Sequence, residues 1–357
     1  MKRKDGKPKL KAKRLLPQFK YGFRNNPHVS YCSEIDCTEK QFSVMSFFSG
    51  CGGLDLGFTG GFSVFGEKYD KLPFNIIGAY DNHQDAVDCY QLNLGDHVYN
   101  VDLTQKHVFQ EADILIGGFP CQDFSSAGPK TGTKGKRGGL YKVMVDYMLK
   151  YKPKVVIGEN VSYLSKLRDG RCLEIIVKDF ESAGYHFDVW ELHAQKYGVP
   201  QNRVRLIFVG VRNDIDGFPV KPIPTTPDIP FTISDAISDL EVVTDESVTN
   251  QSQFFIATKA TSGGGQGDNV NSPDKVAYCI RANARGRIQF HYKLDRRLTV
   301  RECARIQTFP DEFVFQCTTQ RNLTLIGNAV PPILAHAIAT SIAKFLKAIE
   351  ASLVYNT

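Results

Sequence analysis

Residues 43–58 read SVMSFFSGCGGLDLGF, and they contain the first clear change from one type of secondary structure to another. Their first part, Ser43–Phe48, is a short apolar run of the kind that forms a strand. The glycines that follow allow the backbone to turn tightly and to approach another molecule closely. Beyond them the chain opens a helix. The stretch therefore predicts the strand, turn and helix with which a doubly wound sheet begins.

Outward from this stretch, short apolar runs alternate with amphipathic segments as far as Val211. Further strands are predicted at Asn75–Tyr80, Asp113–Gly118, Lys154–Gly158, Phe187–His193 and Arg205–Val211. Apolar residues at helical spacing predict helices at Asn82–Asn93, Leu140–Tyr151 and Cys172–Ala183. Strands that alternate with helices of this length indicate an α/β fold, with a doubly wound, mostly parallel sheet covered by helices on both faces.

The pattern changes after Val211. Residues 213–275 are rich in Pro, Asp, Thr, Ser and Gly, which predicts a small, loop-rich second domain. An apolar helix returns at Pro332–Ala348, and we expect it to fold back on the first domain.

The charge distribution and the cysteine spacing limit the kinds of partner and metal site that the sequence predicts. Residues 1–40 hold 11 Lys and Arg against 4 Asp and Glu, which gives this basic arm a charge of +7. The whole chain has a net charge of +6, so the remaining residues sum to −1. The nine cysteines form no CxxC pair and no zinc-binding spacing with histidine, so we expect reduced thiols and no metal site. The N-terminus lacks the apolar core of a signal peptide, and no run is expected to span a membrane. A cytoplasmic location is therefore predicted.

Reactive side chains are expected together at the carboxyl edge of the sheet. Cys121 follows the predicted strand Asp113–Gly118 in the sequence GGFPCQDFS, and Glu159 ends the next strand along the chain. Arg203 and Arg205 stand two residues apart on one face of an incoming strand. An isolated cysteine is most often a packing residue, but a neighbouring helix start or cation would favour its thiolate form. The placement predicts that thiol, carboxylate and guanidinium meet.

Taken together, these motifs resemble those of the DNA (cytosine-5) methyltransferase family, prokaryotic restriction-modification type. The resemblance covers roughly residues 43–345 and rests on seven motifs in chain order. They are FFSGCGG, GGFPCQDFS, ENV, QNRVR, RRLTVRE, RIQTFP and GNAVPP.

The resemblance implies a Rossmann-like methyltransferase fold that binds S-adenosyl-L-methionine. Asp81 would bind the ribose and Asp102 the adenine. The family usually has Glu where this chain has Asp81, and often an aromatic residue where it has Asn82. The full set of cofactor-binding positions is Phe48, Gly50, Cys51, Gly52, Gly53, Asp81, Asn82, Asp102, Leu103, Pro120, Leu140, Asn328 and Val330.

The same resemblance implies roles in catalysis. Cys121 would add to C6 of cytosine, Glu159 would protonate N3, and Arg205 would hold O2 and orient Glu159. Arg203 is the fourth catalytic candidate. The base would have to be flipped out of the duplex. The predicted DNA-binding residues are Gln122, Ser125, Lys136 and Arg137 in a Gly/Lys-rich loop, with Arg281 and Arg285 further along the chain.

Charge, composition and the resemblance together predict a domain division. We expect a basic arm at 1–40, a catalytic domain at 41–215, a small target-recognition domain at 216–321 and a returning helix at 322–357, with DNA between the two domains. The arm is either an electrostatic tether to DNA or a solubilising tail. The RRLTVRE segment should organise the small domain, with Arg301 and Glu302 as structural ion partners.

The expected partner is double-stranded DNA, with a cognate restriction endonuclease as the functional counterpart of a monomeric enzyme. A tRNA cytosine methyltransferase is one alternative, but the Cys-Phe-Thr tripeptide typical of that branch is absent from the sequence. A catalytically silent DNA-binding regulator is another. Such a protein is expected to have lost Cys121, Glu159 or one of the two arginines, and the sequence retains them all.

Overall fold

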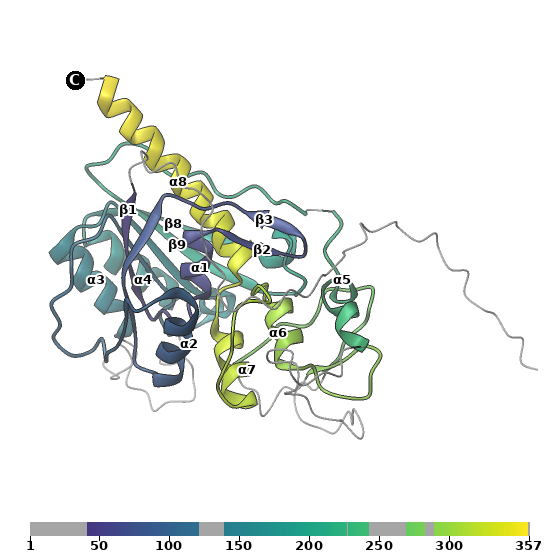
Figure 1. Ribbon diagram of the computed structural model, residues 1–357. Helices are drawn as coiled ribbons and strands as arrows, with labels where there is room; N and C mark the ends of the chain where they lie inside the picture. Colours follow the sequence, from purple (N-terminus) through teal and green to yellow (C-terminus); the bar gives the residue numbers. More distant parts are fainter. Residues whose placement is uncertain (1–40, 121–138, 227, 243–268, 283–288, 356–357) are drawn as a thin grey trace, which may run out of the picture. The chain divides into compact units, whose positions relative to one another are not determined.

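A computed structural model gives the fold of the chain and describes residues 41–120, 139–226, 228–242, 269–282 and 289–355. Its centre is a seven-stranded sheet in the order β5-β4-β1-β6-β7-β9-β8 (Figure 1). The strands are β1 (Phe42–Phe47), β4 (Phe74–Asp81), β5 (Val98–Asn100), β6 (Ile114–Gly117), β7 (Val155–Val161), β8 (Tyr185–His193) and β9 (Val204–Arg212).

The sheet is mostly parallel, as predicted. β5, β4, β1, β6 and β7 pair in parallel, whereas β9 pairs antiparallel with both β7 and β8. β7 continues through Val161, so Glu159 lies inside the strand and does not end it, as the sequence had suggested.

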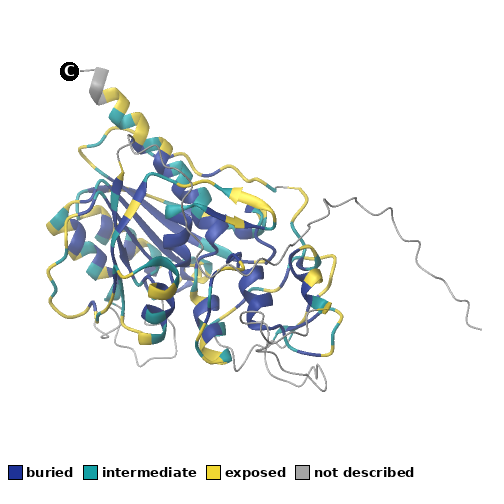
Figure 2. Cartoon of the chain, in the orientation of Figure 1, coloured by how far each residue is buried: buried dark blue, intermediate teal, exposed yellow. Residues whose placement is uncertain are grey.

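Helices cover both faces of the sheet, and each face has its own hydrophobic core. One core joins the sheet to α1 (Gly53–Thr59), α2 (Gln84–Leu94) and α8 (Pro332–Tyr355). The other joins it to α3 (Leu140–Tyr151) and α4 (Arg171–Glu181). Figure 2 shows the central strands of the sheet as mostly buried. The α/β doubly wound architecture predicted from the sequence is therefore confirmed.

Helix α8 packs closely on α1. A Cβ atom placed on Gly57 would lie 2.2 Å from the Cβ of Ala335 and 2.7 Å from the carbonyl oxygen of Pro332, so only glycine permits this approach. By length and composition alone, the helical stretch Thr319–Ser352, which includes α7 and most of α8, could cross a membrane. However, 67% of its most apolar window is buried inside the protein, which is the property of a core helix. Helix α8 ends at Tyr355, seven residues beyond the end at Ala348 that the sequence predicted.

The remaining elements are short. They are the hairpin β2 (Phe62–Val64) and β3 (Glu67–Tyr69), the 3-10 helices η3 (Ser162–Lys166), η4 (Ala194–Tyr197) and η5 (Ser238–Val242), the strands β10 (Asn269–Val270) and β11 (Gln289–Phe290), and the helices α5 (Ile233–Ile237), α6 (Val300–Ile306) and α7 (Thr319–Asn328). Most of them follow β9, where the sequence is rich in loop-forming residues.

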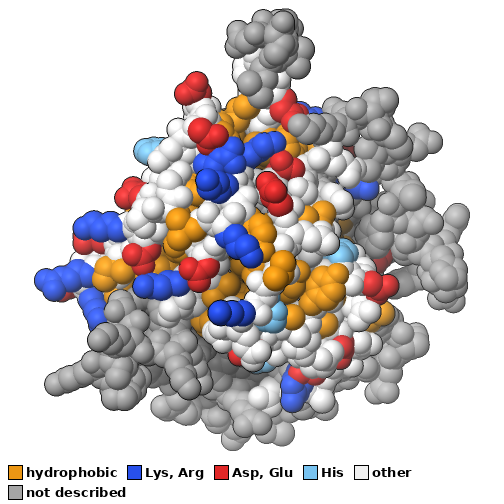
Figure 3. Space-filling view, turned by 90° about the vertical axis from the view of Figure 1, so that its left-hand side faces the viewer, with side chains coloured by type: hydrophobic (Ala, Val, Ile, Leu, Met, Phe, Trp, Pro, Cys, Tyr) orange, Lys and Arg blue, Asp and Glu red, His pale blue; other side chains and the backbone are white. Residues whose placement is uncertain are grey.

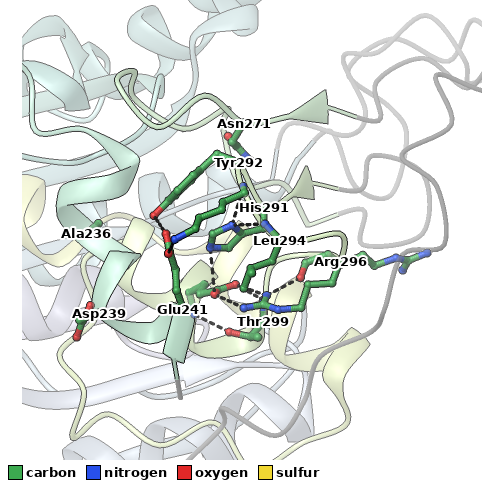
Figure 4. Close-up of polar contacts among 12 residues, drawn as sticks. Ala236, Asp239, Glu241, Asn271, His291, Tyr292, Leu294, Arg296 and Thr299 are labelled. Atoms are coloured by element: carbon green, nitrogen blue, oxygen red, sulfur yellow. Dashed lines mark hydrogen bonds and ion pairs between the residues drawn. The ribbon is translucent and has the colours of Figure 1, made fainter. Parts of the chain in front are cut away.

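A buried ion pair organises the residues around α6 (Figure 4). Two guanidinium nitrogens of Arg296 donate to the two carboxylate oxygens of Glu302, at 2.8 and 2.7 Å. Glu302 also caps α6, because it accepts from the backbone N–H of Thr299 while the Thr299 hydroxyl accepts from the N–H of Glu302. The bidentate pair therefore fixes both the start of α6 and the strand residues before it.

The structural role expected for Arg301 and Glu302 is thus correct, but the partners are not those that the sequence suggested. Glu302 pairs with Arg296, while Arg301 donates to the backbone carbonyls of Pro310 and Phe313 at 3.0 and 2.8 Å. Successive residues on a helix point in different directions, so Arg301 and Glu302 face different neighbours.

A second buried network lies under the glycine-rich turn. The carboxylate of Asp55 accepts from the hydroxyls of Ser46 and Tyr90, both at 2.8 Å. The Tyr90 hydroxyl also lies 3.1 Å from Nε2 of His97. Burial raises the pKa of Asp55 to about 6, although both hydroxyls favour the charged form.

This shift predicts how stability depends on pH. Because folding favours the neutral Asp55 carboxyl, its contribution is full below the unfolded pKa of 3.8 and is lost as pH rises through about 6. The unfolding free energy of the wild type minus that of Asp55→Asn should fall by up to about 3 kcal/mol between pH 4 and 7. Urea unfolding at several pH values measures it.

Asp113→Asn is the matched control. Hydrogen bonds with Lys154 and Ser43 outweigh burial and lower the pKa of Asp113, so this carboxylate is already ionised across the range. Its difference from wild type should stay constant. If the difference in unfolding free energy between wild type and Asp55→Asn were equally independent of pH, the raised pKa of Asp55 would be contradicted.

Candidate active site

The glycine-rich turn after β1 is held in an unusual backbone conformation. Phe48, Gly50 and Gly52 have φ values of 55°, 55° and 87°, in the left-handed region that glycine adopts most readily. Asp81, at the end of β4, fastens this turn by accepting a hydrogen bond from the N–H of Gly50 at 2.9 Å. Its other oxygen accepts from the N–H of His83, also at 2.9 Å. The turn and the end of β4 therefore form one preorganised unit.

The turn fits a bound ligand with polar groups. The Ser49 hydroxyl is buried and has no hydrogen-bond partner among the described residues, which is costly unless something else binds there. A Cβ placed on Gly50 would meet no atom within 4 Å, so space is open on that side. On the other side a Cβ on Gly53 would lie 2.5 Å from the carbonyl oxygen of Val330. The segment 328–330 thus closes one wall.

Other predicted cofactor residues follow β5 and β6 or lie at the ends of helices. Asp102 follows β5, is exposed, and accepts from the N–H and hydroxyl of Thr104 at 2.9 and 2.7 Å. These hydrogen bonds lower the pKa of its carboxyl, so it is ionised at neutral pH. Asn82 is exposed and Leu103 is buried. Pro120 follows β6, Leu140 begins α3, and Asn328 ends α7.

Glu159 and Arg205 form an ion pair at the same edge of the sheet. Nε of Arg205 lies 2.7 Å from Oε1 of Glu159, and the two side chains are only 11% and 10% exposed. The register of β7 and β9 places Val161 opposite Arg205, so the first residues of the antiparallel strand reach the carboxyl ends of its neighbours. A carboxyl group and a fixed cation are therefore held together in a nearly dry site.

The chain that leads to Cys121 runs beside this pair. A Cβ placed on Gly118 would lie 3.2 Å from Oε2 of Glu159. The amide of Asn160 donates to the carbonyl oxygen of Phe119 at 2.9 Å, which anchors the residues before Pro120. Asn160 has a positioning role that was not predicted, although it belongs to the ENV motif.

The predicted DNA-binding residues are mostly outside the part of the chain that the structure describes. Arg281 is described and is exposed. Cys121, Gln122, Ser125, Lys136, Arg137 and Arg285 lie outside the described residues.

Arg203 does not join the ion pair. Its side chain is buried, with 1% of the residue exposed, and donates to the backbone carbonyls of Ile280 (2.9 Å), Gly327 (3.0 Å) and Ala329 (2.7 Å). Burial, together with the nearby charge of Arg205, lowers the pKa of Arg203 to about 10. The expected meeting of both arginines with Glu159 is therefore seen only for Arg205.

Two buried glutamines extend the contacts of Arg203, and sequence reasoning gave neither of them a role. Gln201 donates to the carbonyl of Ile306 at 3.0 Å and accepts from the N–H of Ile280 at 3.2 Å. It also donates to Gln307, which in turn donates to the carbonyl of Ala329. Both glutamines could have been singled out by their motifs, because Gln201 is the first residue of QNRVR and Gln307 lies within RIQTFP.

A family model described as C-5 cytosine-specific DNA methylase matches residues 42–344. The chain belongs to this family. Among curated relatives, the Type II methyltransferase M.BsuRI of Bacillus subtilis is 33% identical, over 87% of this chain and 81% of the relative. The Type II methyltransferase M.NgoFVII of Neisseria gonorrhoeae is 32% identical, over 87% and 88%.

A solved structure shares the fold. It is an Escherichia coli prophage protein described as a DNA modification methyltransferase, with a TM-score of 0.66, 21% identity, and coverage of 86% of this chain and 100% of that one. The family resemblance seen in the motifs is confirmed, and the protein is a DNA (cytosine-5-)-methyltransferase.

The contacts of Arg203 predict a large effect on stability. Arg203→Ala removes a donor from each of three carbonyls, of which that of Ala329 keeps Gln307, and leaves a cavity, so the free energy of unfolding should fall by at least about 3 kcal/mol. Urea unfolding at pH 7 measures this loss.

Arg321→Ala is the control for loss of one arginine. Arg321 pairs with Asp85 but its side chain is 64% exposed, so its removal should cost no more than about 1 kcal/mol. Equal losses for the two variants would show that the buried contacts of Arg203 are not significant.

Proposed function

We propose that the Glu159–Arg205 pair and Cys121 methylate C5 of a cytosine flipped out of a specific short sequence in double-stranded DNA. The observation that carries this proposal is the buried pair at 2.7 Å, beside the residues that lead directly to Cys121. A side chain that is only 10% exposed cannot reach a base stacked within a duplex, which supports base flipping.

The chemistry begins with the poor reactivity of cytosine C5. The Cys121 thiolate forms a bond to C6, and the electrons of the C5–C6 double bond move towards C5 and N3 as Glu159 gives its proton to N3. Arg205 donates to O2 and keeps Glu159 oriented. S-adenosyl-L-methionine would supply the electrophilic methyl group for attack by C5 and would leave as S-adenosyl-L-homocysteine. A base then removes the C5 proton, the bond from C6 to sulfur breaks, and N3 returns its proton to Glu159.

The cofactor would lie against the turn after β1. Asp81 is one methylene shorter than the usual glutamate, but two backbone N–H groups already fix its carboxylate. It would accept hydrogen bonds from the ribose hydroxyls, and Asp102 would bind the adenine. Ser49 adds a buried hydroxyl in need of a partner. We propose that the other predicted cofactor positions complete this site.

Arg203 acts in this scheme as a positioning residue. One of its three carbonyl contacts is to Ala329, which precedes the Val330 carbonyl over Gly53, while Arg205 two residues later holds Glu159. Loss of Arg203 would therefore disturb the cofactor wall and the catalytic pair together.

The biological setting follows from the curated relatives. Both are Type II methyltransferases, so we infer that methylation protects DNA from a cognate restriction endonuclease. We further infer a cytoplasmic monomer with a small target-recognition domain at 216–321. The residues proposed to contact DNA are Gln122, Ser125, Lys136, Arg137, Arg281 and Arg285.

Methyl transfer tests the main proposal. Wild-type protein should transfer labelled methyl from S-adenosyl-L-methionine to unmodified DNA, and bisulfite sequencing should place it on cytosine in one short motif. Cys121→Ala should transfer none, because no other nucleophile adds to C6. Label on tRNA alone would support the tRNA alternative, and no label on either would support the silent regulator.

Substitution of Glu159 tests the proton transfer. Glu159→Gln keeps the shape of the side chain but cannot give up a carboxyl proton, so the single-turnover rate should fall by about 10²–10⁴-fold. Binding of the same DNA should be retained. Asn160→Ala is a neighbouring control, expected to shift the rate less because the Asn160 side chain bonds only to the backbone of Phe119 and Val161 in the described part of the chain. An unchanged rate for Glu159→Gln would exclude the assigned role.

A further inference from the structure

The segment that follows β7 carries a group of basic side chains to which no role has yet been assigned. Residues 162–171 read SYLSKLRDGR, with Lys166, Arg168 and Arg171 against the single acid Asp169. We propose that this segment, the β7 ledge, is a second DNA-binding surface that holds backbone phosphates beside the active site. The proposal rests on DNA being the substrate.

The topology of the sheet places the β7 ledge at the catalytic edge. β7 carries Glu159 and ends at Val161, and η3 begins at the next residue. Helix α4 then starts at Arg171 and leads back towards the start of β8. Strands β7 and β8 both pair antiparallel with β9, so β7 and β8 run in the same direction. The whole ledge therefore lies between the carboxyl end of one strand and the start of the returning helix.

The basic side chains of the ledge are available to a ligand. Lys166, Arg168 and Arg171 are all exposed. None of them forms an ion pair with any residue that the structure describes, whereas many other basic residues, such as Lys154, Arg212 and Arg321, do. Exposed basic side chains without acidic partners suit the phosphates of DNA, which attract them irrespective of base sequence.

The ledge also has a defined backbone. Leu164 and Leu167 are buried, with 0% and 6% exposed, and they anchor it in the core shared with α3 and α4. Between the two arginines the chain turns through three left-handed residues, with φ values of 50°, 55° and 85° at Arg168, Asp169 and Gly170. Binding to DNA would therefore require less ordering of the backbone than a free loop would.

An aromatic side chain completes the surface. Tyr163 is 61% exposed although tyrosine usually buries its ring, and its hydroxyl can donate to a phosphate or sugar oxygen. By contrast, the face shown in Figure 3 mixes acidic and basic side chains with apolar ones, and no wide basic area is seen in that view. The ledge, in comparison, carries three basic side chains and one acidic side chain within ten residues.

The test is the salt dependence of DNA binding. A variant with Lys166→Gln, Arg168→Gln and Arg171→Gln should bind a 30-base-pair duplex of arbitrary sequence about tenfold or more weakly at moderate salt. The slope of log affinity against log salt concentration should become shallower by up to about 2.7, or about 0.9 for each lost phosphate contact. The melting temperature and the single-turnover rate at saturating DNA should not change.

Two further variants separate the ledge from general charge effects. The triple variant of Lys221, Lys344 and Lys347 to Gln removes the same charge from exposed positions on and near α8, and should keep wild-type affinity and slope. Arg168→Lys with Arg171→Lys keeps the charge and should also bind normally. Identical losses in the α8 variant, or wild-type slope in the ledge variant, would overturn the proposal.

Failure of the proposed function would look different. Binding is measured on any duplex and needs no methyl transfer, so an inactive wild type that still showed the ledge-dependent slope would contradict only the proposed reaction. An active wild type whose slope ignored the ledge would contradict only the ledge.

Discussion

A guanidinium group that has been almost wholly removed from water must find acceptors inside the protein, and Arg203 finds them in the carbonyls of Ile280, Gly327 and Ala329. These carbonyls come from two segments that are far apart in the chain. Leaving such a charge unpaired would cost several kcal/mol, so the two segments are held where the guanidinium needs them. The wall over Gly53 is part of this arrangement, because Ala329 precedes the Val330 carbonyl that lies over Gly53.

The fold was readable from the sequence because its signals are local. Apolar strands such as Phe42–Phe47 and Ile114–Gly117 need only their own residues to be recognised, and the helices between them show their period directly. The position of the glycine-rich turn and of Glu159 and Arg205 at one edge follows from the connection of these elements. The ends of elements were less certain, as β7 and α8 show, because packing against neighbours extends them.

The partners of buried polar groups were not readable. Sequence proximity suggested that Arg301 and Glu302 act as ion partners and that Arg203 stands with Arg205, whereas Glu302 pairs with Arg296 and Arg203 binds backbone carbonyls. Every residue offers the same carbonyl group, so nothing in the sequence marks which ones will face an arginine after folding. Motif membership indicated that these residues matter, but only the fold shows what each one holds.

The direction of β9 has a consequence for how such enzymes could diversify. Because β9 runs against β7, it brings its first residues to the catalytic edge and leaves the sheet at the opposite end, with Val211 across from Val155. All seven strands are in place before the chain enters the loop-rich region that follows. The free energy of closing a loop grows only slowly with its length. Loops after Arg212 can therefore change in length while the seven-stranded sheet stays intact, provided that Ile280 and residues 327–330 keep their contacts with Arg203 and Gly53.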